Sequence, residues 1–187
     1  MQPLQIIEKY YQPGSKEHKI FVIHAAMVTK KALEIAKRIP ERKPDLQFIQ
    51  EAAMLHDIGI FKTDAQDIGC HGDKPYICHG YLGREVLEKE GLSKHALVCE
   101  RHTGVGISKP EIEKNKLPIP KRDMNPISLE EEIICFADCF YSKDPMYLTE
   151  EKSLKKIRDE LAKFGKDKVE KFNQWCELFK ETNVKTA

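Results

Sequence analysis

The 187-residue sequence has no long apolar run, no excess of either charge and no close cysteine pair. No stretch approaches the roughly 20 apolar residues that a membrane-spanning helix needs. The first residues also lack the basic and apolar regions of a signal peptide. A formal net charge of +1 gives no electrostatic footprint for nucleic acid or an anionic membrane. We therefore expect neither a membrane nor a nucleic acid as a partner.

The six cysteines include no CxxC pair, which indicates reduced thiols and a cytoplasmic location rather than a disulfide framework. Cys70-His71 and Cys78-His79 leave open a structural zinc site of two cysteines and two histidines, although the usual close cysteine pair is missing. The composition, 41% hydrophobic and 33% charged, fits one globular domain over residues 1–187.

The periodic stretches of the sequence have a helical period, and no run alternates as a strand should. Predicted helices cover residues 3–11, 15–39, 44–56, 76–90, 93–103, 128–142 and 149–165, with a last helix after Gly165. The sequence therefore predicts an all-α bundle. Residues 18–143 are expected to contain the functional site, and the helices within 149–182 are expected to serve as scaffold.

Capping residues and apolar stripes set the predicted helix ends and faces. Predicted N-caps are Ser15, Ser93, Ser128 and Thr149, and Pro44 is expected in a first turn. Leu154, Ile157, Leu161 and Phe164 form one predicted apolar stripe, and Val169, Phe172, Cys176 and Phe179 another. Residues 59–75 and 104–126 are expected to be loops, the second long enough to have a functional role.

His56 and Asp57 stand side by side at the end of a helix with a core-facing stripe. Burying such a pair is costly without a cationic partner, so the pair predicts a metal ion. A hydrogen-bonded core pair is the alternative for these two residues alone. Four further residues of the same types also lie among apolar helical residues: His24, His79, His102 and Asp138. Imidazole nitrogens with carboxylate oxygens suit iron, manganese or zinc better than magnesium.

This pattern resembles the HD-domain metal-dependent phosphohydrolases, whose signature is a histidine, a later His-Asp pair and a distal aspartate on helices. The matching residues are His24, His56-Asp57 and Asp138, and His-Asp-Ile-Gly is the HDIG spelling of the pair. His79 and His102 resemble the two extra histidines of binuclear HD proteins. These include the HD-GYP phosphodiesterases and the enzymes that split dinucleoside tetraphosphates symmetrically, and the latter are closest in pattern.

The resemblance implies a helical fold and two divalent ions, with iron or manganese preferred and zinc, magnesium or nickel as alternatives. One ion would be held by His24, His56, Asp57 and Asp138. Asp57 would bridge to the second, held by His79 and His102. Two cations roughly 3.5–4 Å apart activate a water for attack on phosphorus. The expected enzyme is a phosphohydrolase acting on a nucleotide or similar small phosphoester.

The catalytic residues expected on this basis are Asp57 and His56, with Lys62 and Arg101 as phosphate contacts. Lys143 is a further candidate for phosphate, and for all three cations an ordinary solvated role is equally open.

The departures from the relatives concern the substrate. Arg101 precedes His102 and no GYP motif is present, which argues against cyclic di-GMP cleavage. Ile60 occupies the position where the tetraphosphate hydrolases carry lysine, and the glutamate-aspartate pair of guanosine-polyphosphate hydrolases is missing. A non-catalytic HD sensor or scaffold that binds metal or nucleotide is the alternative function. An oligomer is compatible with either function.

Overall fold

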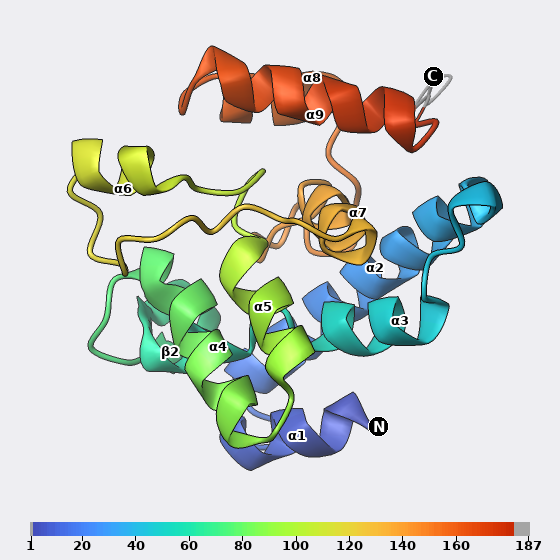
Figure 1. Cartoon of the computed structure of the whole chain (residues 1–187). Helices are drawn as coiled ribbons and strands as arrows, with labels where there is room; N and C mark the ends of the chain where they lie inside the picture. The colour runs from blue at the N-terminus through green and yellow to red at the C-terminus, as the bar shows by residue number, and fades with distance from the viewer. Residues whose placement is uncertain (1, 182–187) are drawn as a thin grey trace.

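A computed structural model describes residues 2–181, and nine α-helices lie within this range (Figure 1). They are α1 Pro3–Tyr10, α2 Lys16–Arg38, α3 Leu46–Leu55, α4 His79–Lys89, α5 Ser93–Arg101, α6 Lys109–Lys114, α7 Leu129–Asp138, α8 Leu154–Leu161 and α9 Lys166–Leu178. The expected all-α bundle is confirmed, and residue 182, the last of the expected scaffold segment 149–182, lies outside the described residues.

Side-chain caps begin several of these helices. His18 N–H donates to Ser15 Oγ at the start of α2, and Glu131 N–H donates to Ser128 Oγ at the start of α7. Three expectations were wrong. Asp45 caps α3, so Pro44 lies before the helix; Ser93 makes no capping bond; and Ser153, rather than Thr149, caps α8. Each of the observed caps Ser15, Asp45, Ser128 and Ser153 accepts a hydrogen bond on its side-chain oxygen from the backbone N–H three residues later.

The main core forms where α2, α3, α5 and α7 meet, and α8 and α9 lie across the outer side of α7 (Figure 1). Aromatic rings join α7 to α9: the ring centroid of Phe136 lies 5.1 Å from that of Phe172 and 5.2 Å from that of Phe179. The predicted stripe of α9 is therefore confirmed. Phe164 was wrongly placed in the α8 stripe, because α8 ends at Leu161 and the Phe164 side chain is 77% exposed.

The two predicted loops contain more regular structure than the sequence indicated. Residues 59–75 include the 3-10 helix η2, Ile58–Lys62, and an antiparallel pair of two-residue strands, β1 Asp64–Ala65 and β2 Cys70–His71. Residues 104–126 include α6, where Ser108 and Glu111 form a reciprocal capping box. Elements this short have no detectable period, so long-range packing decides them.

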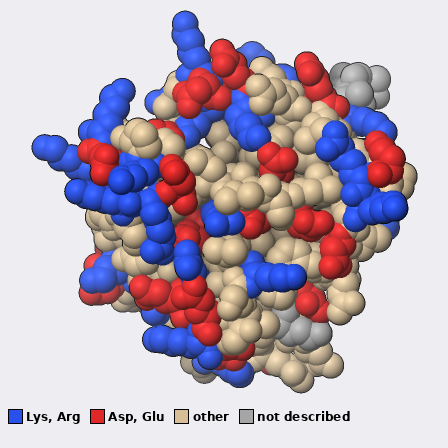
Figure 2. Space-filling view, viewed as in Figure 1, with Lys and Arg blue, Asp and Glu red and all other residues tan. Residues whose placement is uncertain are grey.

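No helix in the described range combines the length and the apolar character that crossing a bilayer requires. Lys and Arg side chains interleave with Asp and Glu over the visible face of the molecule (Figure 2), as the near-zero net charge implies.

Candidate metal centre

The six predicted ligands lie on, or directly beside, the five helices α2, α3, α4, α5 and α7. His24 lies within α2, whereas the others stand at helix ends. His56 and Asp57 follow α3, His79 begins α4, His102 follows α5, and Asp138 ends α7. Five of the six are nearly inaccessible to solvent, and Asp138 is partly accessible. The helices thus bring together every residue that the sequence assigned to metal.

These residues form two groups whose potential ligand atoms lie within 4.8 Å of one another. The first ligand group comprises His24, His56, Asp57 and Asp138, and the second comprises Asp57, His79 and His102.

Asp57 belongs to both groups because its two oxygens face opposite ways. Asp57 Oδ2 lies 3.2 Å from His24 Nε2 and 3.1 Å from His56 Nε2. Asp57 Oδ1 lies 3.4 Å from His79 Nε2 and 3.3 Å from His102 Nε2. Each ligand group therefore includes one oxygen of this carboxylate.

Backbone carbonyls orient three of the imidazoles. Nδ1 of His56, His79 and His102 lies 2.6–2.7 Å from the carbonyl oxygen three residues earlier in each case. A carbonyl only accepts hydrogen bonds, so Nδ1 carries a proton, and whenever the ring is neutral its Nε2 lone pair faces the centre.

The donor atoms fit a metal better than they fit one another. His79 Nε2 and His102 Nε2 are 3.1 Å apart, and two lone pairs at that distance repel unless a proton or a cation lies between them. His56 Nε2 and Asp57 Oδ1 are buried without a hydrogen bond among the described residues, whereas the Lys143 ammonium group forms an ion pair with Asp57 Oδ2. Buried polar atoms are normally satisfied, so this convergence matches a site built for cations.

The pKa shifts in the metal-free centre also indicate that its carboxylates are stabilised by nearby positive charge. Burial opposes a charge on His56, but the Asp57 and Asp138 carboxylates outweigh it and raise the pKa of His56 to about 10. Burial lowers the pKa of His79 to about 4. Burial favours a protonated Asp57, but Lys143 and His56 hold the pKa of that carboxyl well below its usual range. Without metal, protons on neighbouring groups balance the carboxylates.

Glycine at position 59 allows α4 to approach the His-Asp pair. A Cβ on Gly59 would lie 2.2 Å from the His79 carbonyl oxygen and 2.3 Å from the Gly83 nitrogen. A side chain at Gly83 would likewise meet Cys99 Sγ at 2.1 Å. The glycine of the His-Asp-Ile-Gly motif therefore lets the helix that carries His79 pack directly beside Asp57.

The three cations that the sequence put near the site have different surroundings. Lys143 Nζ forms an ion pair with Asp57 Oδ2. Lys62 Nζ lies 3.9 Å from Glu85, and Arg101 Nη1 donates to Glu131 at 2.9 Å. Neither Lys62 nor Arg101 lines the cavity at the centre, so their predicted role as phosphate contacts stays a prediction. The sequence offered one signal for Lys143, its position five residues after Asp138.

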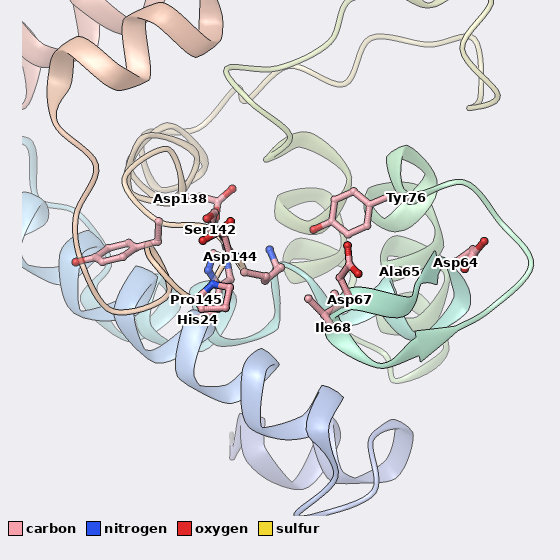
Figure 3. Close-up of a pocket in the computed structure, with 12 residues that line it drawn as sticks. His24, Asp64, Ala65, Asp67, Ile68, Tyr76, Asp138, Ser142, Asp144 and Pro145 are labelled. Atoms are coloured by element: carbon pink, nitrogen blue, oxygen red, sulfur yellow. Dashed lines mark hydrogen bonds and ion pairs between the residues drawn. The ribbon is translucent and has the colours of Figure 1, made fainter.

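The metal centre opens into a cavity of about 730 Å³. Figure 3 shows its two walls: Asp64, Ala65, Asp67, Ile68 and Tyr76 on one side, and His24, Asp138, Ser142, Asp144 and Pro145 on the other. A volume of this size accommodates a nucleotide-sized molecule.

The alternative zinc site of Cys70, His71, Cys78 and His79 is not formed in the described range, where the two groups above are the potential metal sites. His79 belongs to the second ligand group, and the Cys78 thiol donates to the Pro118 carbonyl. Cys70 packs in a hydrophobic cluster and His71 is exposed.

With this geometry, the fold and centre define a helical metal-site protein. A model of the HD domain matches residues 21–142, which include all six ligand residues. The chain therefore belongs to the HD-domain family of metal-dependent phosphohydrolases.

The similar proteins include one with no assigned activity and two named for RNA methylation. "Uncharacterized protein MJ0778" of Methanocaldococcus jannaschii is 38% identical over 120 residues, 63% of each chain. A tRNA (cytidine(56)-2'-O)-methyltransferase of Picrophilus torridus is 33% identical over 126 residues, 67% of this chain and 32% of that protein. The corresponding Thermoplasma volcanium protein is 28% identical over 139 residues, 74% of this chain and 36% of its own length.

The chain thus spans less than two thirds of the first relative and about a third of each methyltransferase. No solved structure matches it significantly. A specific likeness to the dinucleoside tetraphosphate hydrolases is not among these matches and stays a prediction.

Proposed function

We propose that this protein is a phosphohydrolase that cleaves a phosphoester or phosphoanhydride of a nucleotide or similar small molecule. The observation that carries the proposal is the shared Asp57, whose two oxygens face two groups of nitrogen and oxygen donors beside an open cavity that His24 and Asp138 line. Two adjacent cation sites are the arrangement that hydrolytic enzymes use on phosphoryl groups.

The two ligand groups would hold two divalent ions, and their histidine-rich composition favours iron or manganese over zinc, nickel or magnesium. Bound ions of this kind supply an activated water and neutralise the phosphoryl oxygens. In the reaction the water oxygen bonds to phosphorus, the bond from phosphorus to the leaving oxygen breaks, and the leaving oxygen takes a proton.

The protein's own residues position these ligands. The carbonyls of Ala53, Tyr76 and Cys99 fix the three Nδ1–H groups, so Nε2 of each ring stays available as a ligand. Asp57 and His56 are the central catalytic residues in this proposal. Lys62 and Arg101 are kept as proposed phosphate contacts that would have to leave Glu85 and Glu131.

The partner in this proposal is a small phosphorylated molecule rather than a nucleic acid or a membrane. A cytoplasmic location accords with the six cysteines, all of which are free thiols. Self-association into an oligomer is compatible with this function.

A second candidate is a non-catalytic HD module that binds metal or nucleotide as a sensor or scaffold. The comparison with relatives supports this candidate, because the stretch that matches is only about a third of two proteins named as tRNA methyltransferases. In those proteins an HD-like segment accompanies a longer chain whose name describes another reaction.

Metal content followed by a screen of phosphoesters separates the two candidates. The purified protein is loaded with iron or manganese, its metal is quantified by mass spectrometry, and mono-, di- and dinucleoside polyphosphates are offered as substrates. We expect up to two ions and release of phosphate, both abolished in Asp57→Asn. Metal binding without turnover of any phosphoester would support the sensor, and a folded protein that binds no metal would contradict both.

A further inference from the structure

The cavity beside the metal centre contains one largely buried lysine. Lys143 follows α7 in the segment Tyr141–Asp144, and its side chain is 13% exposed. Its Nζ forms an ion pair with Asp57 Oδ2, the same oxygen that faces His24 and His56. The ammonium group therefore lies at the boundary between the first ligand group and the open cavity.

This ion pair is a metal-free arrangement, because divalent cations would take over Asp57. A buried lysine that loses its carboxylate needs another anion nearby, since an unpaired buried charge is strongly unfavourable. Cations bound by the two ligand groups would oppose a move of this ammonium group further inward by like-charge repulsion. The partners that remain are the aspartates of the cavity wall and an anionic group bound in the cavity over the metal centre.

The charge of the cavity wall limits how large that anion is. Among the described residues that line the cavity, Lys143 is the single lysine or arginine. The outer wall carries the exposed aspartates Asp64, Asp67 and Asp144 (Figure 3). A second or third phosphate extending outward would meet these carboxylates without a cation to neutralise it. Hydroxyl groups, in contrast, donate hydrogen bonds to carboxylates readily.

We propose that the cavity selects a substrate with a single terminal phosphoryl group, held by Lys143, and a neutral hydroxyl-bearing remainder that faces Asp64, Asp67 and Asp144. Phosphate monoesters of nucleosides or sugars have this chemistry, whereas nucleoside polyphosphates do not. This proposal rests on the proposed function, because it assumes that the two ligand groups hold metal. It adds to that function the residue that binds phosphate and the number of phosphates that the cavity accepts.

Tyr76 closes the opposite side of the cavity from Asp138 (Figure 3). Its ring lies 4.8 Å from the His79 ring, centroid to centroid, so it packs directly beside the second ligand group. The tyrosine offers an aromatic face and a hydroxyl to the part of the substrate beyond the phosphoryl group. A sugar or a base suits this surface better than a further phosphate.

Direct binding to the metal-loaded protein tests the role of Lys143 independently of turnover. Isothermal titration with inorganic phosphate compares the wild type with Lys143→Met and Lys143→Arg, and metal content is measured for each. Loss of one charge-assisted hydrogen bond predicts roughly 10- to 100-fold weaker phosphate binding in Lys143→Met. Lys143→Arg should retain most of the affinity, and the metal content should stay at the wild-type value in both.

The matched control is Lys155→Met, which removes an exposed lysine on α8 that does not line the cavity. Its phosphate affinity should equal that of the wild type. Unchanged phosphate affinity in a metal-loaded Lys143→Met protein would overturn the assignment. Loss of metal from that variant would overturn it too, because Lys143 would then serve the metal centre instead.

A series of one nucleoside as its mono-, di- and triphosphate tests the number of phosphates. We expect the highest kcat/KM for the monophosphate and a loss of about tenfold or more for each added phosphate. Neutralising the wall with Asp67→Asn and Asp144→Asn together should reduce that discrimination, while Asp159→Asn on α8 should not. A wild-type preference for the triphosphate would refute the single-phosphoryl cavity. Phosphate binding that depends on Lys143, without hydrolysis of any compound, would contradict the proposed function but would still support Lys143 as the residue that binds phosphate.

Discussion

Removal of metal should lower the thermal stability of this protein by an amount that reveals how many ions it holds. The two ligand groups are assembled from helices α2, α3, α4, α5 and α7, so ions in them would cross-link most of the bundle. An ion of this kind binds the folded chain and not the unfolded one, because unfolding separates its ligands. Metal binding is therefore folding free energy.

The expected magnitude follows from linkage. An ion stabilises the folded state by about 2.7 kcal/mol when its free concentration is a hundred times its dissociation constant, so two ions contribute roughly 5 kcal/mol. A chain of 187 residues changes its melting temperature by roughly 2–4 °C per kcal/mol. Complete removal of metal should then lower the melting temperature by about 10–20 °C.

Two variants divide this effect between the ligand groups. His102→Gln removes one of three ligands of the second ligand group and leaves the first intact, so about half of the metal-dependent shift should remain. Asp57→Asn removes the ligand that both groups share, and the shift should disappear. His71→Gln changes an exposed histidine outside both groups and should behave as the wild type.

Calorimetry at a fixed free metal concentration, set by a metal buffer, measures these shifts, and mass spectrometry counts the bound ions. Circular dichroism of each metal-free variant confirms that it is folded at the starting temperature. Equal melting temperatures for loaded and metal-free wild type would refute the reasoning. Retention of two ions by His102→Gln would refute the composition of the second ligand group.

Two further predictions concern packing and acid stability. Gly59→Ala should destabilise the protein by about 3 kcal/mol or more and weaken metal binding, because the new Cβ would lie 2.2 Å from the His79 carbonyl oxygen. Chemical denaturation measures the loss of stability, and metal titration measures the loss of metal affinity. Glu181→Gln should cost about 2–3 kcal/mol at pH 7, because the buried carboxylate pairs with Lys31 at 3.0 Å and with Arg38 at 2.6 Å. Burial opposes this carboxylate, but Arg38 and Lys31 lower its pKa below the ordinary 4.5. The stabilisation is thus complete above pH 4.5 and fades as pH falls through the folded pKa, so the wild-type advantage in urea unfolding should shrink in acid.

Matched substitutions control both experiments. Gly91→Ala also changes a glycine, but nothing lies within 4 Å of the added Cβ, so its cost should be limited to the strain of a φ of +76°. Glu41→Gln breaks an exposed pair with Lys180 and should leave the unfolding curve unchanged. Gly59→Ala with wild-type stability would contradict the close approach of α4, and a Glu181→Gln difference that grew in acid would contradict the ion-pair account.

Much of the helical framework could be predicted because a helix is marked in the sequence by the period of its apolar residues and by its capping residues. The stripe and the Ser15 cap fixed α2 within one residue of its observed bounds, and Ser128 fixed the start of α7. The two-residue strands and α6 show no such period, since a period needs more residues than they contain. Phe164 was placed inward because the sequence period continued past Leu161, where the helix itself stops.

The candidate ligands were predictable for a different reason. Histidines and aspartates among apolar residues are rare enough to stand out wherever the chain later brings them, so His24, His79, His102 and Asp138 could be chosen without knowing their distances. Their assembly around Asp57 then required the fold, because 114 positions separate His24 from Asp138. Gly59 and Gly83 show how close that packing is.

The sequence by itself determined most of the helices, the types of ligand and the family signature, all of which depend on neighbours along the chain. Only the tertiary structure decided which cation faces the centre. Lys62, Arg101 and Lys143 look alike in the sequence, but the fold pairs the first with Glu85, the second with Glu131 and the third with Asp57. A long charged side chain takes whichever carboxylate packing brings within reach, and that partner is set by the arrangement of helices rather than by local pattern.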